Sequence, residues 1–135
     1  MAALDDRVRA LLGGTGLAHL ATVLRDGGPH AAPVWVAVEG EHVVVFKEEG
    51  TVALANVRRD PRVALTVVDP EDPYRYCTVR GVVTGERTGQ DAIEVLQRLA
   101  VSYTGRPYPE SVLRPGVVLE IEPRRVSLVE IGGFG

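Results

Sequence analysis

The strongest constraint in this sequence is a series of short valine-rich runs separated by tight turn signals. Several runs alternate apolar with smaller or polar side chains, the period of two that a half-buried strand requires. Twenty-three of the 135 residues are valine, a β-branched type that favours strands over helices. Because consecutive runs are joined by tight turns, we expect a mainly β protein whose strands pair antiparallel.

Turn residues divide the chain into about seven predicted strands. Asp26 with Gly27 supplies one hairpin turn, Gly40 supplies a second, and Pro70 with Pro73 marks a rigid acidic turn. A sheet of this size protects its edges best by closing into a barrel. The predicted strands cover residues 17–24, 29–39, 42–47, 62–68, 74–85, 117–122 and 126–131.

Three segments change to the spacing of amphipathic helices. They are residues 5–12, 50–59 and 91–103, with Thr51 as a candidate N-cap of the second. The length fits one domain, residues 1–135. Chains this short often complete a site by dimerising.

Composition and charge exclude several classes of partner. Fifteen basic against eighteen acidic residues give a net charge of -3, which argues against an electrostatic nucleic-acid binder. No apolar stretch approaches the roughly 20 residues that a membrane-spanning helix needs. Residues 1–6 carry acids where a secretory signal has basic residues. The expectation is a cytoplasmic protein that binds neither nucleic acid nor membrane.

The residues able to act as metal ligands or nucleophiles lack the patterns that such sites need. His19, His30 and His42 lie in separate predicted strands or at a strand start, without the close spacing that holds a metal. Cys77 lies in a valine-rich strand with no local activator, so we expect a buried, inert thiol. We therefore name no catalytic residue and no metal site.

A candidate phosphate site lies where the third predicted strand leads into the second predicted helix. Lys47, the only lysine among the fifteen basic residues, and Thr51 flank the start of this helix. The free N–H groups of a helix start suit a phosphate. Alternatively, Lys47 merely ends a strand and Thr51 merely caps a helix, and spacing alone leaves both interpretations open.

Three blocks of sequence carry a family resemblance that spans residues 17–131. They are residues 20–23 (Leu-Ala-Thr-Val), 28–35 (Gly-Pro-His-Ala-Ala-Pro-Val-Trp) and 56–65 (Asn-Val-Arg-Arg-Asp-Pro-Arg-Val-Ala-Leu). Together they resemble the pyridoxamine 5'-phosphate oxidase-like flavin-binding split barrels, and more closely the branch that uses the deazaflavin F420. The resemblance implies an antiparallel split β-barrel with short helices.

The resemblance also implies an activity and a cofactor. It implies a homodimer with cofactor sites at the subunit interface, which transfers a hydride to or from a small organic substrate. The expected cofactor is F420, with FMN as the alternative; the cofactor carries the redox chemistry while the protein binds and orients it. The cofactor-site residues that it implies are His30, Trp35, Lys47, Thr51, Val52, Ala53, Asn56, Arg75 and Tyr76.

One position departs from the family pattern. The family commonly has a lysine three positions before the equivalent of Asn56, where it pairs with the cofactor phosphate, and this chain has Ala53 there. Lys47 is the candidate replacement. The departure keeps two alternatives open: an FMN-binding pyridoxamine 5'-phosphate oxidase-like protein, and a non-catalytic split barrel that holds another ligand such as a tetrapyrrole.

Several of these residues also have purely structural interpretations. Trp35 is equally suited to a core or to a dimer interface, and Tyr76 to packing at a dimer seam. Arg58 is suited to a solvated helix end, or to binding the anionic polyglutamate tail of F420.

Overall fold

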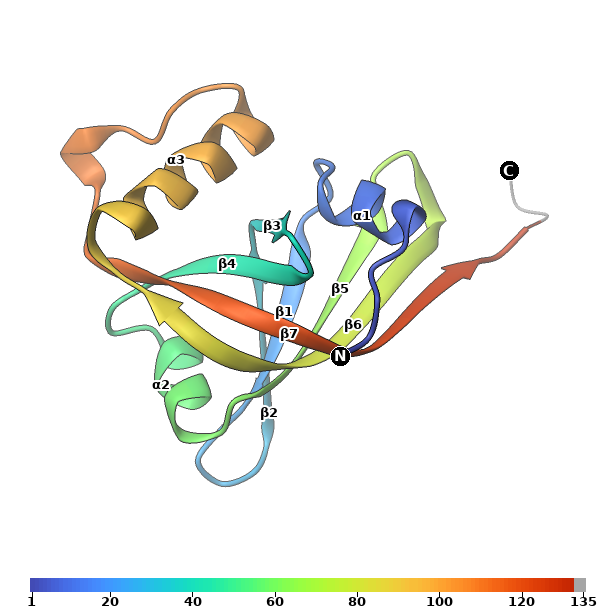
Figure 1. Ribbon diagram of the computed structural model, residues 1–135, viewed down its shortest axis with the longest axis horizontal. Coiled ribbons are helices and arrows are strands. Elements are labelled where there is room, and N and C mark those ends of the chain that lie inside the picture. Colours follow the sequence, from blue (N-terminus) through green and yellow to red (C-terminus); the bar gives the residue numbers. More distant parts are fainter. Residues whose placement is uncertain (133–135) are drawn as a thin grey trace.

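The computed structural model describes residues 1–132 and shows a curled antiparallel sheet with three α-helices (Figure 1). The seven strands follow the order β2-β1-β5-β6-β7-β4-β3, and each neighbouring pair is antiparallel. The prediction of a mainly β, antiparallel split barrel is therefore confirmed. The elements are α1 (Asp6–Leu12), β1 (Ala18–Val23), β2 (Pro29–Val34), β3 (Val36–Glu39), β4 (His42–Glu48), α2 (Val52–Arg59), β5 (Arg62–Asp69), β6 (Asp72–Arg87), α3 (Gly89–Thr104), the 3-10 helix η1 (Glu110–Val112) and β7 (Gly116–Glu130).

The sheet is open between β2 and β3. The prediction of one strand over residues 29–39 is wrong, because the strand breaks at Trp35. β2 pairs with β1 and β3 pairs with β4, so two strands that are consecutive in the chain form opposite edges of the sheet. Within residues 1–132, no backbone ladder joins them. Val34 and Val36, on either side of the break, both pack in the core. The alternation of inward and outward side chains therefore continues across the break.

At the other end of the chain, two predicted strands form one. The prediction of separate strands over residues 117–122 and 126–131 is wrong. Instead, β7 is continuous and carries a bulge: Arg80 of β6 lies opposite Arg125, and Gly81 lies opposite Pro123. Arg124 is therefore the extra residue of the bulge.

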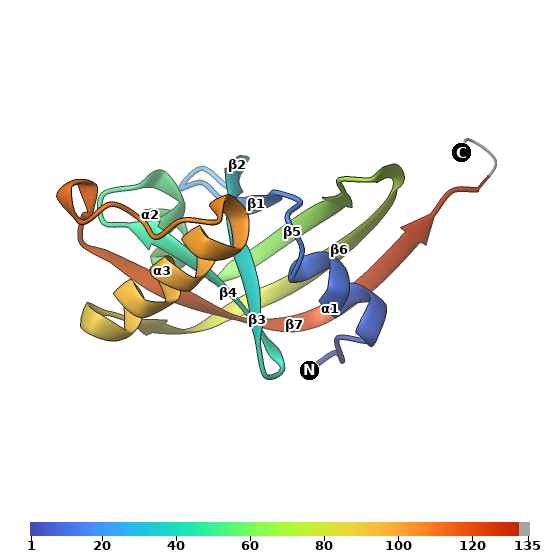
Figure 2. The ribbon, with the colours of Figure 1, turned by 90° about the horizontal axis from the view of Figure 1, so that it is seen from above.

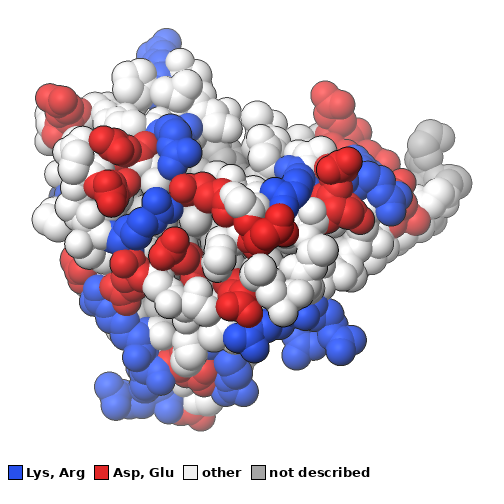
Figure 3. Space-filling view, in the orientation of Figure 1, with Lys and Arg blue, Asp and Glu red and all other residues white. Residues whose placement is uncertain are grey.

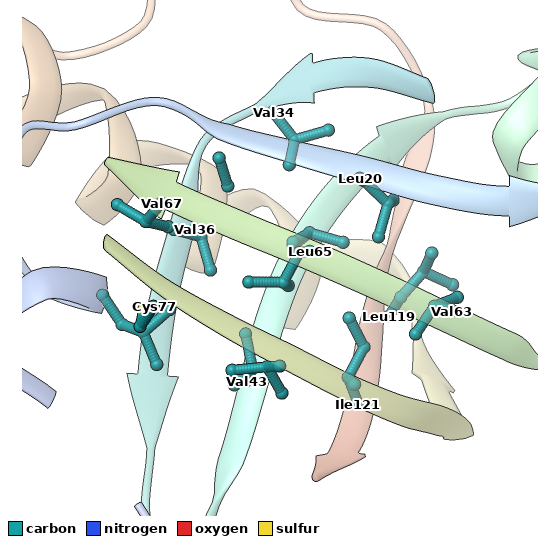
Figure 4. Packing of buried hydrophobic residues seen from close by; sticks show 14 of the residues in the cluster. Leu20, Val34, Val36, Val43, Val63, Leu65, Val67, Cys77, Leu119 and Ile121 are labelled. Carbon is teal, nitrogen blue, oxygen red and sulfur yellow. The ribbon is translucent and has the colours of Figure 1, made fainter. Parts of the chain in front are cut away.

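The main core fills the inside of the curl. Leu20, Val43, Leu65 and Ile121 converge there from four different strands and are at most 1% exposed (Figure 4). Cys77 packs in the same cluster, and burial raises the pKa of its thiol. The prediction of a buried cysteine is confirmed.

A second apolar cluster lies under α3, on the opposite face of β4 and β7. Val95 and Leu99 of the helix pack on Val44 and Val118 of the strands. Trp35 packs against this cluster. α1 and α3 lie toward opposite ends of the long strands β6 and β7, as two perpendicular views show (Figures 1 and 2).

The three predicted helices are present, each within about two residues of its expected bounds. Asp5 caps α1 by accepting a hydrogen bond from the Val8 amide at 3.0 Å. Thr51 occupies the N-cap position of α2, but its hydroxyl instead donates to the Glu48 carbonyl at 2.9 Å. Within residues 1–132, no helix has the length and apolarity that crossing a membrane requires.

Candidate functional site

A cavity of about 380 Å³ lies beside the break between β2 and β3. Its walls come from β2, β4, α3 and the connection that follows α3, so segments far apart in the sequence build it. One side is apolar and aromatic, and the other end carries the polar groups of Lys47, Glu48 and Thr51. The full lining is Leu17, Pro33, Val34, Trp35, Phe46, Lys47, Glu48, Thr51, Leu96, Leu99 and Tyr108.

Two tyrosines hold Trp35 in place on the aromatic side. Its indole stacks on Tyr103, with ring centroids 5.6 Å apart and planes 12° apart, and meets Tyr108 edge-on at 6.4 Å and 78°. The Tyr103 hydroxyl accepts a hydrogen bond from the Val36 amide at 3.1 Å and lies 3.2 Å from the Gly16 carbonyl, to which it donates. Burial raises the pKa of Tyr103. Trp35 thus both packs against the second cluster and lines the cavity.

Gln97 fixes Tyr108 through two backbone hydrogen bonds. The Tyr108 amide donates to Gln97 Oε1 at 2.6 Å, and Gln97 Nε2 donates to the Tyr108 carbonyl at 3.0 Å. The sequence carried no signal for this contact, since Tyr108 lies in a proline-rich connection. Sequence reasoning also missed Phe46 and Leu96, whose apolar side chains are typical of any core.

The polar end of the cavity holds donors suited to a small anion. Lys47 is half-buried; burial lowers the pKa of its ammonium, and the charge of Glu48 offsets part of that effect. None of the ion pairs within residues 1–132 involves Lys47. Because the Thr51 hydroxyl is turned to Glu48, the first N–H groups of α2 have no side-chain cap. An ammonium beside uncapped helix N–H groups favours an anion.

Asn56 positions α2 against the sheet. Its Nδ2 donates to Thr22 Oγ1 at 3.0 Å, and its Oδ1 accepts from Arg59 at 2.8 Å. Asn56 and Thr22 are 3% and 2% exposed, so this bond is made out of contact with water. Asn56 therefore anchors α2 to β1, and its assignment to the cofactor site stays a prediction.

The first turn of α2 carries two further predicted residues. Val52 is exposed, whereas the Ala53 side chain is 3% exposed and packs inward. Neither residue lines the cavity. Any contribution from these positions to an anion site comes from their backbone N–H groups.

His30, Arg75 and Tyr76 do not line the cavity either. His30 lies on β2 opposite Thr22, and its buried Nδ1 has no hydrogen-bond partner among the described residues. Arg75 is ion-paired with Asp69 at 3.2 Å, in the part of β6 near the acidic turn. The placement of these residues in a site shared with a second subunit stays a prediction.

Arg58 is held by two carboxylates. Its guanidinium bonds both oxygens of Glu49 at 3.1 Å and both oxygens of Glu86 at 2.9 and 3.1 Å, which raises its pKa. Arg58 therefore links the loop before α2 to β6. Within residues 1–132, no cluster of three or more His, Cys, Asp or Glu side chains is arranged to hold a metal ion.

Comparison with known proteins gives one family match. The family model described as Pyridoxamine 5'-phosphate oxidase matches residues 4–130. A solved F420 reductase is 30% identical, with 88% of this chain and 94% of that chain covered and a TM-score of 0.79. No protein of curated function matches the sequence.

Two more distant structures share the fold. The conserved hypothetical protein Rv2991 from Mycobacterium tuberculosis is 23% identical, with 99% of this chain and 94% of that chain covered and a TM-score of 0.72. HutZ, the heme storage protein from Vibrio cholerae, is 16% identical, with coverages of 95% and 96% and a TM-score of 0.69.

Proposed function

Because the chain belongs to the pyridoxamine 5'-phosphate oxidase family, we propose that it is an F420-dependent oxidoreductase acting as a homodimer on a small organic substrate. The 30% identity to an F420 reductase favours the deazaflavin over FMN. When bound, the cofactor supplies the hydride-transfer chemistry, and the protein binds and orients it.

The observation that carries this proposal is the division of the cavity into an aromatic side and a polar end, where Lys47 lies with Glu48 and Thr51. Its volume of about 380 Å³ lies within the range of roughly 300–1,000 Å³ that is typical of ligand sites. A planar ring system is suited to the walls formed by Trp35, Phe46 and Tyr108. A phosphate is suited to Lys47 and the uncapped N–H groups of α2. The residues therefore fit a ring carrying a phosphate tail.

Each lining group has a distinct role in this proposal. Lys47 holds the phosphate in place of the family lysine whose position is occupied by Ala53. Trp35 and Tyr108 shield the ring from water, while Tyr103 positions Trp35. No side chain acts as an acid or base; water or substrate takes the proton.

The remaining predicted residues are assigned to the dimer. His30 is assigned to the cofactor because its buried Nδ1 has no hydrogen-bond partner among the described residues. Arg75 and Tyr76 are assigned to face the cofactor or substrate of the partner subunit. Sedimentation tests this assignment: a dimer at micromolar concentration is expected, and a strict monomer would rule out a composite site.

A second candidate is a non-catalytic binding protein. It is favoured by Ala53, because Lys47 is then the one cation among the described residues that line the cavity. A ligand without a phosphate, such as a tetrapyrrole, does not require a second cation at this end of the cavity to pair with a phosphate charge.

Titration distinguishes these candidates, because Trp35 is the only tryptophan and lies in the cavity wall. F420, FMN and riboflavin are added separately while tryptophan fluorescence and heat are followed. Riboflavin is the matched control because it carries the FMN ring without the phosphate. We expect micromolar binding of F420, weaker binding of FMN, and riboflavin weakest. Absence of binding by both F420 and FMN would overturn the oxidoreductase proposal.

A further inference from the structure

Four arginines line a groove on the outside of the sheet that the proposed function does not use. The groove consists of two adjoining hollows of about 350 and 330 Å³, which share Arg62 and Arg80 in their lining. Arg124 and Arg125 complete the second hollow. Among the described residues, no Asp or Glu lines either hollow. The chain is acidic overall, with a net charge of -3, so this concentration of arginine is local.

The bulge in β7 produces this concentration. Because Arg124 is the extra residue, the two consecutive residues Arg124 and Arg125 are both exposed instead of alternating between the faces of the sheet. The opposite strand accommodates the bulge with Gly81, where an added Cβ would lie 2.5 Å from the Glu122 carbonyl oxygen. The close approach of the two strands thus requires glycine, and the arrangement of arginines is a built feature of the sheet.

Two of the four arginines have no carboxylate partner in the part of the chain that the structure describes. Arg62 pairs with Asp60 at 2.7 Å and Arg124 pairs with Glu122 at 3.1 Å. No ion pair within residues 1–132 involves Arg80 or Arg125.

These two unpaired arginines lie directly opposite each other on β6 and β7. Like charges in this position repel and destabilise a sheet. Figure 3 shows basic side chains along the lower edge of the molecule, with acidic side chains between some of them. An anion bound between Arg80 and Arg125 would replace this repulsion with attraction.

We propose that this groove binds a small polyanion that carries phosphate or carboxylate groups along a short chain. Guanidinium groups bind both types of group through paired hydrogen bonds. Because the arginines come from β5, β6 and β7, they are spread along the groove, and a ligand with several charged groups can contact more than one of them. The proposal does not rest on the function assigned to the cavity.

Calorimetric titration with inorganic tripolyphosphate and with citrate tests the proposal and identifies the preferred group. The variant R80Q/R125Q removes the unpaired arginines, and R106Q/R114Q removes the same charge from exposed arginines outside the groove. We expect the wild type to bind at least one probe and R80Q/R125Q to bind it about tenfold or more weakly. R106Q/R114Q should bind like the wild type. Because R80Q/R125Q removes a repulsion, its melting temperature should not fall, which separates lost binding from lost folding.

Three outcomes would overturn the proposal. The first is that neither probe binds the wild type, and the second is that both double variants lose affinity equally, which indicates unspecific charge attraction. The third is that R80Q/R125Q changes the sedimentation of the ligand-free protein, which indicates that the groove is a contact between subunits.

Discussion

Replacing Lys47 with methionine should weaken the binding of phosphate-bearing ligands without destabilising the ligand-free protein. Burial lowers the pKa of Lys47, which means that the folded environment disfavours its charged form. Methionine keeps much of the apolar stem and removes the ammonium. Since Lys47 is only half-buried and solvent screens its charge, we expect the free energy of unfolding to rise by at most about 1 kcal/mol.

The expected effect on binding is larger and has the opposite sign. Loss of one charge-assisted hydrogen bond to the phosphate costs about 1.5–3 kcal/mol, which corresponds to about a ten- to more than a hundredfold increase in Kd. Quenching of Trp35 fluorescence by F420 and FMN measures this increase. Riboflavin, which lacks the phosphate, should bind Lys47→Met and the wild type equally. Arg106→Met, which removes an exposed cation outside the cavity, is the matched control.

The pH dependence follows from the same lowered pKa. Between the folded pKa of Lys47 and its ordinary value of 10.5, the unfolded chain binds more protons than the folded chain. The stability contribution of Lys47 therefore rises with pH across that window, while phosphate binding falls as the ammonium deprotonates. Lys47→Met should abolish both trends. Unchanged FMN affinity in this variant, or an equal loss for riboflavin, would refute the assignment of Lys47 to the phosphate.

Two further variants test the supports of the cavity. Thr22→Val leaves Asn56 Nδ2 buried without its acceptor, so we expect a loss of about 1–3 kcal/mol and a lower melting temperature. The exposed substitution Thr84→Val should change stability little, and an equal effect of the two would argue against the buried bond. Gln97→Leu removes both hydrogen bonds to the Tyr108 backbone, so hydrogen exchange at the Tyr108 amide should accelerate and F420 binding should weaken. Exchange at the wild-type rate would show that Gln97 does not hold the connection.

The fold was largely predictable because its main determinant is local. Alternation of buried valines identified the strands, and turn residues identified their ends. Two predicted strand boundaries were wrong, each for a physical reason. The break at Trp35 preserves the alternation of buried side chains, so the sequence does not reveal it. Pro123 lies in a bulge of a continuous strand, where a missing backbone donor is tolerated. Both the break and the bulge change which strands or residues pair, but neither leaves a mark on the alternation of apolar side chains along the sequence.

The candidate site was predictable only in part. Trp35, Lys47 and Thr51 followed from the resemblance and from the chemistry of a helix start, and they meet in one cavity. Tyr108 and Phe46 did not follow, because their role depends on how α3 and its connection fold over the sheet. Nothing in a linear sequence distinguishes their side chains from ordinary core or loop residues.

The break between β2 and β3 affects how the protein can move. These two edge strands are joined by one residue, Trp35, and not by a backbone ladder, so separating them would break no hydrogen bond between strands. The Tyr103 hydroxyl bonds the backbone of Val36 at the start of β3 and the carbonyl of Gly16, which precedes β1. Because Tyr103 also stacks on the Trp35 indole that lines the cavity, a displacement of β3 from the segment before β1 that moved Tyr103 would also change the cavity wall.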